Sequence, residues 1–147
     1  MNVLVGGTGF IGTALAEELI QQGEAVTSIA RNIPEEKTEG VVYHAIDIFA
    51  HPEQLIPLFG HGATIFLMIG QNSSTFDVAK ELEGFEKVLD VMRTSVPEKV
   101  LFTSTALVYG ESIEAATEHH NLAPKDIYAQ FKVSCEKMIQ EKKKVAF

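Results

Sequence analysis

The 147-residue chain contains no tryptophan and only one cysteine, Cys135. A single cysteine excludes an internal disulfide and fits a reducing compartment, so we expect a cytoplasmic protein. Its neighbours lack metal-ligand spacing and it falls on an expected helix, which indicates a packing residue and no metal site. No run approaches the ~18 apolar residues of a membrane span, and the N-terminus lacks a signal peptide's cationic and apolar regions. We therefore expect no membrane partner.

Basic residues are also scarce, because 12 Lys and Arg stand against 20 Asp and Glu, for a net charge of −8. No basic stripe with interleaved aromatic residues occurs, so nucleic acid is not an expected partner. The length predicts one domain, and the 46% hydrophobic content is sufficient for a buried core.

The opening of the chain is rich in glycine. An apolar run, Val3 to Val5, enters the turn Gly6-Gly7-Thr8-Gly9-Phe10-Ile11-Gly12, and an amphipathic segment through Gln22 follows. Strand, glycine turn and helix form the context of a dinucleotide site, although a purely structural turn is the alternative. Gly6 suits the tight turn, Gly9 the close approach of a pyrophosphate, and Gly12 the packing of the helix on the sheet. The unpaired amides at the helix start would then face the phosphates.

Strand and helix patterns alternate along the rest of the chain. We expect an α/β fold with a doubly wound parallel sheet of Rossmann type in the order 3-2-1-4-5, with helices on both faces. A ligand would lie at the carboxyl ends of the strands. The expected strands are 3–5, 25–30, 41–46, 63–69 and 100–103, with the start of a sixth at 145–147. The expected helices are 10–22, 52–58, a long one that begins at a capping box of Ser74 and Asp77 and carries an apolar stripe from Phe76 to Met92, and 128–142.

Tyr128 and Lys132 are spaced i and i+4, hence on one helix face one turn apart. A nearby cation favours phenolate and lowers a tyrosine pKa from ~10 toward neutral, which makes the phenol a usable general acid or base. Alone, the pair is as compatible with a solvated helix face. Hydroxyls at the end of the expected fifth strand, Thr103 to Thr105, together with the glycine turn make it a joint signal.

These motifs resemble the extended short-chain dehydrogenase/reductase superfamily, specifically the NAD-dependent epimerase/dehydratase family. The resemblance runs from the start of the chain almost to its end. The matching residues are Gly6–Gly12, Asp47-Ile48, Ser104–Gly110, Thr117-Glu118, Pro124 and Tyr128–Lys132 with Glu136.

The resemblance implies roles for individual residues. Tyr128 would be the acid/base during hydride transfer, Lys132 would lower its pKa and bind the nicotinamide ribose, and Thr105 would hydrogen-bond the reacting oxygen. Asp47 would accept from the adenine amino group, or would be only a turn residue. The full set of expected cofactor-binding residues is Gly6, Thr8, Gly9, Phe10, Ile11, Gly12, Arg31, Asn32, Asp47, Ile48, Met68, Ile69, Gly70, Thr103, Tyr128 and Lys132.

The end of the second expected strand departs from the NAD pattern. Where an acidic residue would bind the ribose 2′-hydroxyl, the chain has Ala30 followed by Arg31. A guanidinium can pair with a 2′-phosphate, so we expect NADP to be preferred over NAD. The alternative is that Arg31 is a solvated loop charge.

A second departure follows the fourth expected strand. Met68-Ile69-Gly70-Gln71 stands where the family usually has an alanine-rich turn, and Glu81 where an asparagine is common. An ionised carboxylate only accepts hydrogen bonds, whereas an amide also donates, which alters the proton path around Lys132.

Members of the family continue past the length of this chain. We therefore expect residues 1–147 to form a single, truncated NAD(P)-binding domain without a separate substrate domain. The resemblance implies hydride transfer on an alcohol or carbonyl of a small molecule, such as a nucleotide-sugar, and leaves epimerase, dehydratase and reductase open. The alternative is a non-catalytic NADP-binding regulatory or redox-sensing module. The apolar end at 145–147 predicts a homodimer or larger assembly.

Overall fold

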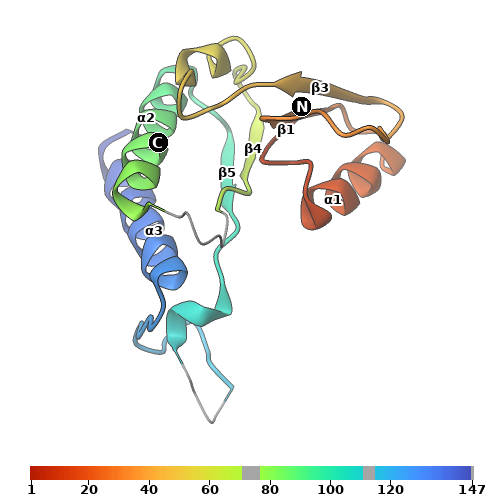
Figure 1. The fold of residues 1–147 in the computed structure, drawn as a ribbon. Helices are drawn as coiled ribbons and strands as arrows, with labels where there is room; N and C mark the ends of the chain where they lie inside the picture. The colour runs from red at the N-terminus through yellow and green to blue at the C-terminus, as the bar shows by residue number, and fades with distance from the viewer. Residues whose placement is uncertain (71–76, 111–114, 147) are drawn as a thin grey trace. The chain divides into compact units, whose positions relative to one another are not determined.

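The computed structural model describes residues 1–70, 77–110 and 115–146. Its strands form a five-stranded parallel sheet in the order β3-β2-β1-β4-β5 (Figure 1). This order confirms the doubly wound topology expected from the sequence. The strands are β1 (Asn2–Val5), β2 (Val26–Ala30), β3 (Val41–Ala45), β4 (Thr64–Leu67) and β5 (Lys99–Phe102).

The chain forms two compact units. The first comprises Met1–Ile69 and Lys87–Thr103 and contains the whole sheet; the second comprises the described parts of 70–86 and 104–147. The helices are α1 (Phe10–Gln21), α2 (Val78–Ser95) and α3 (Ile127–Ala146), with the 3-10 helices η1 (Pro52–Leu55) and η2 (Ala106–Tyr109). Helix α1 belongs to the first unit, and η2 and α3 belong to the second.

The core of the first unit is built on β1, whose four residues are all buried. Both faces of this strand are therefore covered, as a central strand of a parallel α/β sheet requires. On one face Leu4 clusters with Val26 of β2 and Ala16 of α1. The apolar side of α1 completes this layer, with Leu15, Leu19 and Ile20 packed against the cluster.

Two helix boundaries differ from the sequence prediction. The segment expected as a helix over 52–58 is a 3-10 helix that ends at Leu55. Helix α2 begins at Val78, and the Asp77 carboxylate accepts hydrogen bonds from the Ala79 and Lys80 amides at 3.1 and 3.3 Å. Asp77 therefore caps α2. Ser74 and Phe76, in the expected start of this helix, lie outside the described residues.

The prediction of a sixth strand from Val145 is wrong, because Val145 and Ala146 belong to α3. The run from Glu136 to Lys144 consists mainly of good helix formers and contains no turn residue that would end the helix. Phe147 lies outside the described residues. The predicted dimer or larger assembly, which rested on this apolar end, stays a prediction.

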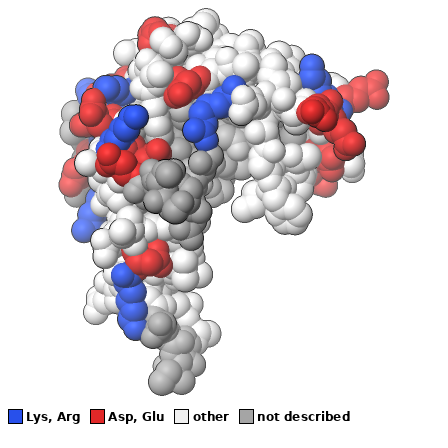
Figure 2. Space-filling model, in the orientation of Figure 1, with Lys and Arg blue, Asp and Glu red and all other residues white. Residues whose placement is uncertain are grey.

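The surface carries charges of both signs, and the helices that the structure describes are not of the membrane-spanning kind. On the face drawn in Figure 2, Lys and Arg side chains lie next to Asp and Glu side chains. Within the described ranges, no helix combines the length and apolar character that crossing a membrane requires.

Candidate functional site

The carboxyl ends of the strands meet at one edge of the sheet in the first unit. Val5 of β1 lies level with Ile29 of β2 and Leu67 of β4, and Leu67 lies level with Phe102 of β5. The segments that follow these strands therefore start at the same edge. This edge carries the expected cofactor-binding residues of the first unit: Gly6, Thr8, Gly9, Phe10, Ile11 and Gly12 after β1, Arg31 and Asn32 after β2, Asp47 and Ile48 after β3, Met68 and Ile69 after β4, and Thr103 after β5.

The glycine turn touches its neighbours through its backbone. Gly6 has a φ of +82°, and a Cβ on it would lie 2.5 Å from the Met68 carbonyl oxygen of the segment after β4. A Cβ on Gly7 would lie 2.6 Å from the Leu4 Cβ and 2.6 Å from the Ser28 hydroxyl oxygen. The glycine spacing alone assigned no role to Gly7, because a close approach to β1 and β2 does not show in the spacing.

Gly9 and Gly12 differ in what surrounds them. A Cβ on Gly12 would lie 2.5 Å from the Gly7 carbonyl oxygen, so the lack of a side chain lets α1 lie directly against the backbone of the turn. The packing of the helix on the sheet through Gly12 stays a prediction. A Cβ on Gly9 would meet no atom of the described residues within 4 Å. The space beside Gly9 is therefore open to a ligand.

The N-terminus of α1 is suited to an anion. Gly9 is the N-cap and provides no side-chain cap, and the first turn contains no acidic residue. Phe10 and Ile11 are 94% and 62% exposed. The first amides of the helix therefore receive no cap from the N-cap residue, and the positive end of the helix dipole is not offset by an acid in this turn.

At the end of β3, Asp47 is in part a turn residue. One oxygen of its carboxylate accepts hydrogen bonds from the Phe49 and Ala50 amides, at 3.1 and 3.2 Å. Arg31 and Asn32, which follow β2, are exposed. Asp47 can therefore be a turn residue and still bind the adenine amino group, because the turn uses only one of its two carboxylate oxygens.

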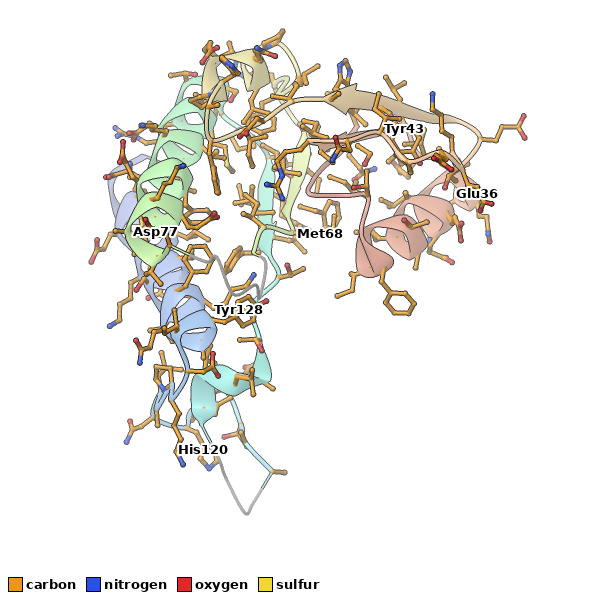
Figure 3. The ribbon with its side chains drawn as sticks, in the orientation of Figure 1. Glu36, Tyr43, Met68, Asp77, His120 and Tyr128 are labelled. Carbon is orange, nitrogen blue, oxygen red and sulfur yellow. The ribbon has the colours of Figure 1, made fainter. Side chains whose placement is uncertain are left out.

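In the second unit, Tyr128 extends from α3 (Figure 3), and Lys132 lies on the same face of this helix, as predicted. The helix start is capped by Asp126, whose carboxylate accepts a hydrogen bond from the Ala129 amide at 2.7 Å. The Lys132 ammonium nitrogen lies over the Tyr128 ring, 5.5 Å from its centroid. This geometry corresponds to a cation–π contact.

Gly70 packs against this pair. Its φ is +132°, and a Cβ on it would lie 3.0 Å from Lys132 Nζ and 3.3 Å from Tyr128 Cε2. A side chain at this position would be strained by the positive φ and would require Lys132 or the tyrosine ring to shift slightly. Glycine at position 70 therefore fits both the backbone and its neighbours, while Gln71 lies outside the described residues.

The hydroxyl segment after β5 packs on α3 through η2. Thr105 is the N-cap of η2, and its side-chain oxygen accepts a hydrogen bond from the Leu107 amide at 3.3 Å. The Ser104 hydroxyl donates a hydrogen bond to the Glu136 carboxylate of α3. The second unit therefore contains all three predicted catalytic residues, Thr105, Tyr128 and Lys132.

Electrostatics corrects the prediction for Tyr128. Its pKa is raised above 10, first by burial and then by the Asp126 carboxylate. The Lys132 ammonium lies over the face of the ring. Its tendency to lower the Tyr128 pKa does not outweigh burial and the Asp126 carboxylate. Tyr128 is therefore a protonated phenol at neutral pH and is ready to donate a proton.

Lys132 is 2% exposed, and burial lowers its pKa to about 8, while electrostatic interactions with Cys135 and Glu136 oppose this fall. Cys135 is fully buried, and burial raises the pKa of its thiol to about 12, so it remains a protonated packing residue. Lys132 is thus the buried cation of the second unit's site, close to its titration midpoint.

Replacing Lys132 with methionine is expected to stabilise the fold below pH 8. The fall of its pKa from 10.5 to about 8 corresponds to roughly 3 kcal/mol of destabilisation while Lys132 is charged in both the folded and unfolded states. The folded state loses this proton first as pH rises, so the wild type gains stability between about pH 8 and 10.5. The advantage of Lys132→Met should therefore shrink over this range.

Urea unfolding of both proteins from pH 7 to 10.5 measures this difference. Lys137→Met, which removes an exposed lysine from the same helix, is the control and should give a small difference at every pH. A Lys132→Met advantage that does not change with pH would contradict the assignment.

Comparison with known proteins agrees with the sequence motifs. The family model described as the NAD dependent epimerase/dehydratase family matches residues 3–144. The comparison with curated proteins gave no significant match.

Solved structures share the fold over almost the whole chain. A UDP-glucose 4-epimerase matches with a TM-score of 0.82 and 22% identity, covering 99% of this chain and 48% of its own. A UDP-N-acetylglucosamine 4-epimerase from Methanobrevibacter ruminantium M1, in complex with UDP-N-acetylmuramic acid, matches at 0.80 and 25% identity, with 99% and 51% covered. A UDP-glucuronic acid 4-epimerase from Bacillus cereus, in complex with NAD, matches at 0.79 and 22%, with 99% and 53% covered. The chain thus spans about half the length of these proteins.

Proposed function

Because the chain belongs to the NAD-dependent epimerase/dehydratase family, we propose that it is the cofactor-binding part of an enzyme acting on a small-molecule alcohol or carbonyl. The observation that carries this proposal is the open helix start at Gly9, on the sheet edge where Rossmann folds bind dinucleotides. The bound nicotinamide would supply or accept the hydride.

The first unit's residues fit a dinucleotide. The uncapped amides of α1 would hold the pyrophosphate, since Gly9 leaves room for it to approach the backbone. The carboxylate oxygen of Asp47 that the turn does not use would accept from the adenine amino group. The remaining residues at this edge, among them Asn32, Ile48, Met68, Ile69 and Thr103, would line the cofactor.

Arg31 determines the proposed preference for NADP over NAD. It is exposed at the end of β2, where a carboxylate would repel a 2′-phosphate and a guanidinium can pair with it. The preference is inferred from this residue alone, because the solved relative quoted above with a dinucleotide contains NAD.

The second unit's residues would handle the proton. Tyr128 would donate to, or accept from, the substrate oxygen as the acid/base, and its protonated state at neutral pH suits donation to a carbonyl. Lys132 would bind the nicotinamide ribose and stabilise negative charge on the phenol oxygen during transfer. The Thr105 hydroxyl, whose oxygen caps η2, still has its hydrogen to donate to the reacting oxygen.

Nucleotide-sugars are the proposed substrate class. The solved relatives include 4-epimerases of UDP-linked sugars, one of them in complex with UDP-N-acetylmuramic acid. Epimerases, dehydratases and reductases share the first hydride step, so the reaction type within this class stays open.

A regulatory module that binds NADP without chemistry is the alternative. Glu81 favours this alternative, because it stands where the family commonly has an asparagine. Its negative charge acts on Cys135, next to the proposed site. A carboxylate changes the hydrogen bonds available to the proton path beside Lys132.

Gly9→Ala is expected to fold like the wild type and to bind NADPH about tenfold more weakly or worse. Its extended backbone, with φ −83° and ψ 177°, tolerates alanine, and the new methyl contacts no protein atom. It would, however, occupy the space that the pyrophosphate approaches. Calorimetric titration with NADPH measures the loss, and Gly60→Ala, whose Cβ would make only an ordinary contact, is the control. Unchanged affinity in Gly9→Ala would exclude a phosphate at this site.

Arg31→Asp is expected to reverse the cofactor preference. The wild type should bind NADPH more tightly than NADH, and the variant should lose about tenfold or more in NADPH affinity while gaining affinity for NADH. The same titrations with both cofactors test it, and Lys37→Asp is the matched charge reversal in the same exposed loop. Tighter NADH binding by the wild type would overturn the NADP proposal.

Tyr128→Phe separates the enzyme from the regulatory module. In a longer form that turns over substrate, the variant should lose about a hundredfold or more of the hydride-transfer rate, because the acid/base is gone while the ring still packs under Lys132. Cofactor affinity should stay within about twofold. Tyr43→Phe, which removes a phenol from β3, is the control. Full activity in Tyr128→Phe would refute the catalytic assignment.

A further inference from the structure

Helix α3 carries a third polar residue in line with the proposed catalytic pair. Tyr128, Lys132 and Glu136 follow each other at intervals of four, so they occupy successive turns along one side of the helix. The Glu136 carboxylate accepts a hydrogen bond from the Ser104 hydroxyl. Ser104 directly precedes Thr105, which begins η2.

We propose that Glu136 is a positioning residue whose carboxylate holds the Ser104-Thr105 segment against the side of α3 that carries Tyr128 and Lys132. The significance of this role for catalysis rests on the proposed function. Its structural basis is the hydrogen bond between the Glu136 carboxylate and Ser104, the residue next to Thr105. Glu136 lies on the same helix as the proposed acid/base pair.

The geometry of the segment makes this contact effective. The Thr105 side chain and carbonyl accept from the Leu107 and Val108 amides, both at 3.3 Å, so Thr105 and η2 move as one piece. The chain leaves η2 at Gly110 and returns to it, since the Ala123 amide donates to the Val108 carbonyl at 2.9 Å. Fixing Ser104 on α3 therefore fixes the start of a hydrogen-bonded segment rather than a single side chain.

Glu136 also acts on Lys132 through its charge. Burial favours the neutral amine, and the Glu136 carboxylate, one turn further along α3, favours the ammonium. Tyr128 and Cys135 on α3 and the Gly70 backbone also lie near Lys132, and Glu81 of α2 acts on Cys135. Because the Cys135 thiol stays protonated at neutral pH, Glu136 is a neighbour that supplies negative charge to Lys132 there.

Three variants separate the hydrogen bond from the charge. Glu136→Gln keeps an acceptor for Ser104 and removes the charge, Ser104→Ala removes the hydrogen bond and keeps the charge, and Glu136→Ala removes both. Glu141→Gln, an exposed charge loss on the same helix, is the matched control.

Two measurements on the 147-residue chain read these effects. Amide hydrogen exchange at Leu107, Val108 and Gly110 should become up to about tenfold faster in Ser104→Ala and Glu136→Ala, and should stay near the wild-type rate in Glu136→Gln. NMR titration of the Lys132 side chain should give a midpoint that falls below about 8 in Glu136→Gln and Glu136→Ala. That midpoint should stay in place in Ser104→Ala, which a merely structural role of Glu136 would not predict.

Unchanged exchange in Ser104→Ala, or a Lys132 midpoint that moves no more in Glu136→Gln than in Glu141→Gln, would overturn the proposal. If Glu136→Ala does not fold, the other two variants still decide each effect. Neither measurement uses cofactor or substrate. Failure of the proposed function, seen as no binding of NADPH or NADH, is therefore distinguishable from failure of this inference.

Discussion

The start of α1 lies directly against the backbone of the turn that precedes it, and the first unit's site depends on that contact. Gly12 faces the Gly7 carbonyl, and Gly7 in turn lies against Leu4 and Ser28 of the two central strands. Since no side chain separates these layers, the helix begins immediately at the sheet edge, with its uncapped amides beside the open space at Gly9. A methyl group at Gly7 or Gly12 would move the helix away and its amides with it.

Much of the fold follows from local patterns in the sequence. Apolar runs separated by amphipathic segments predict parallel strands, and a glycine turn after the first strand predicts the order in which they pair. Helix boundaries are harder to predict from sequence, because they depend on which side chain accepts hydrogen bonds from the free amides at the helix start. Asp77 does so at the start of α2. At 145–147, three apolar residues resembled the start of a strand, but the preceding run of helix formers without a turn residue carries α3 through Val145 and Ala146.

The site was predictable in its residue types and less so in its electrostatics. Helical spacing suffices to place Tyr128 and Lys132 on one face. It cannot give the balance between a neighbouring cation, burial and a nearby carboxylate, since this depends on packing from other segments. For Tyr128, burial and Asp126 prevail. Gly70 illustrates the same limit, because its contact with Lys132 joins residues far apart in sequence.

The burial of Lys132 fits the role proposed for it better than a purely structural one. An ammonium that is 2% exposed costs stability, and an apolar residue of similar length would fill the same space without that cost. The surroundings of Lys132 partly oppose the loss of its charge. Gly70 adds no side chain beside the ammonium, and the negative charge of Glu136 favours the charged form. The result is a lysine that is mostly charged at neutral pH, yet close enough to its midpoint for small changes nearby to alter its charge. A purely structural lysine has no need of such a balance, whereas a residue that stabilises a transient phenolate does.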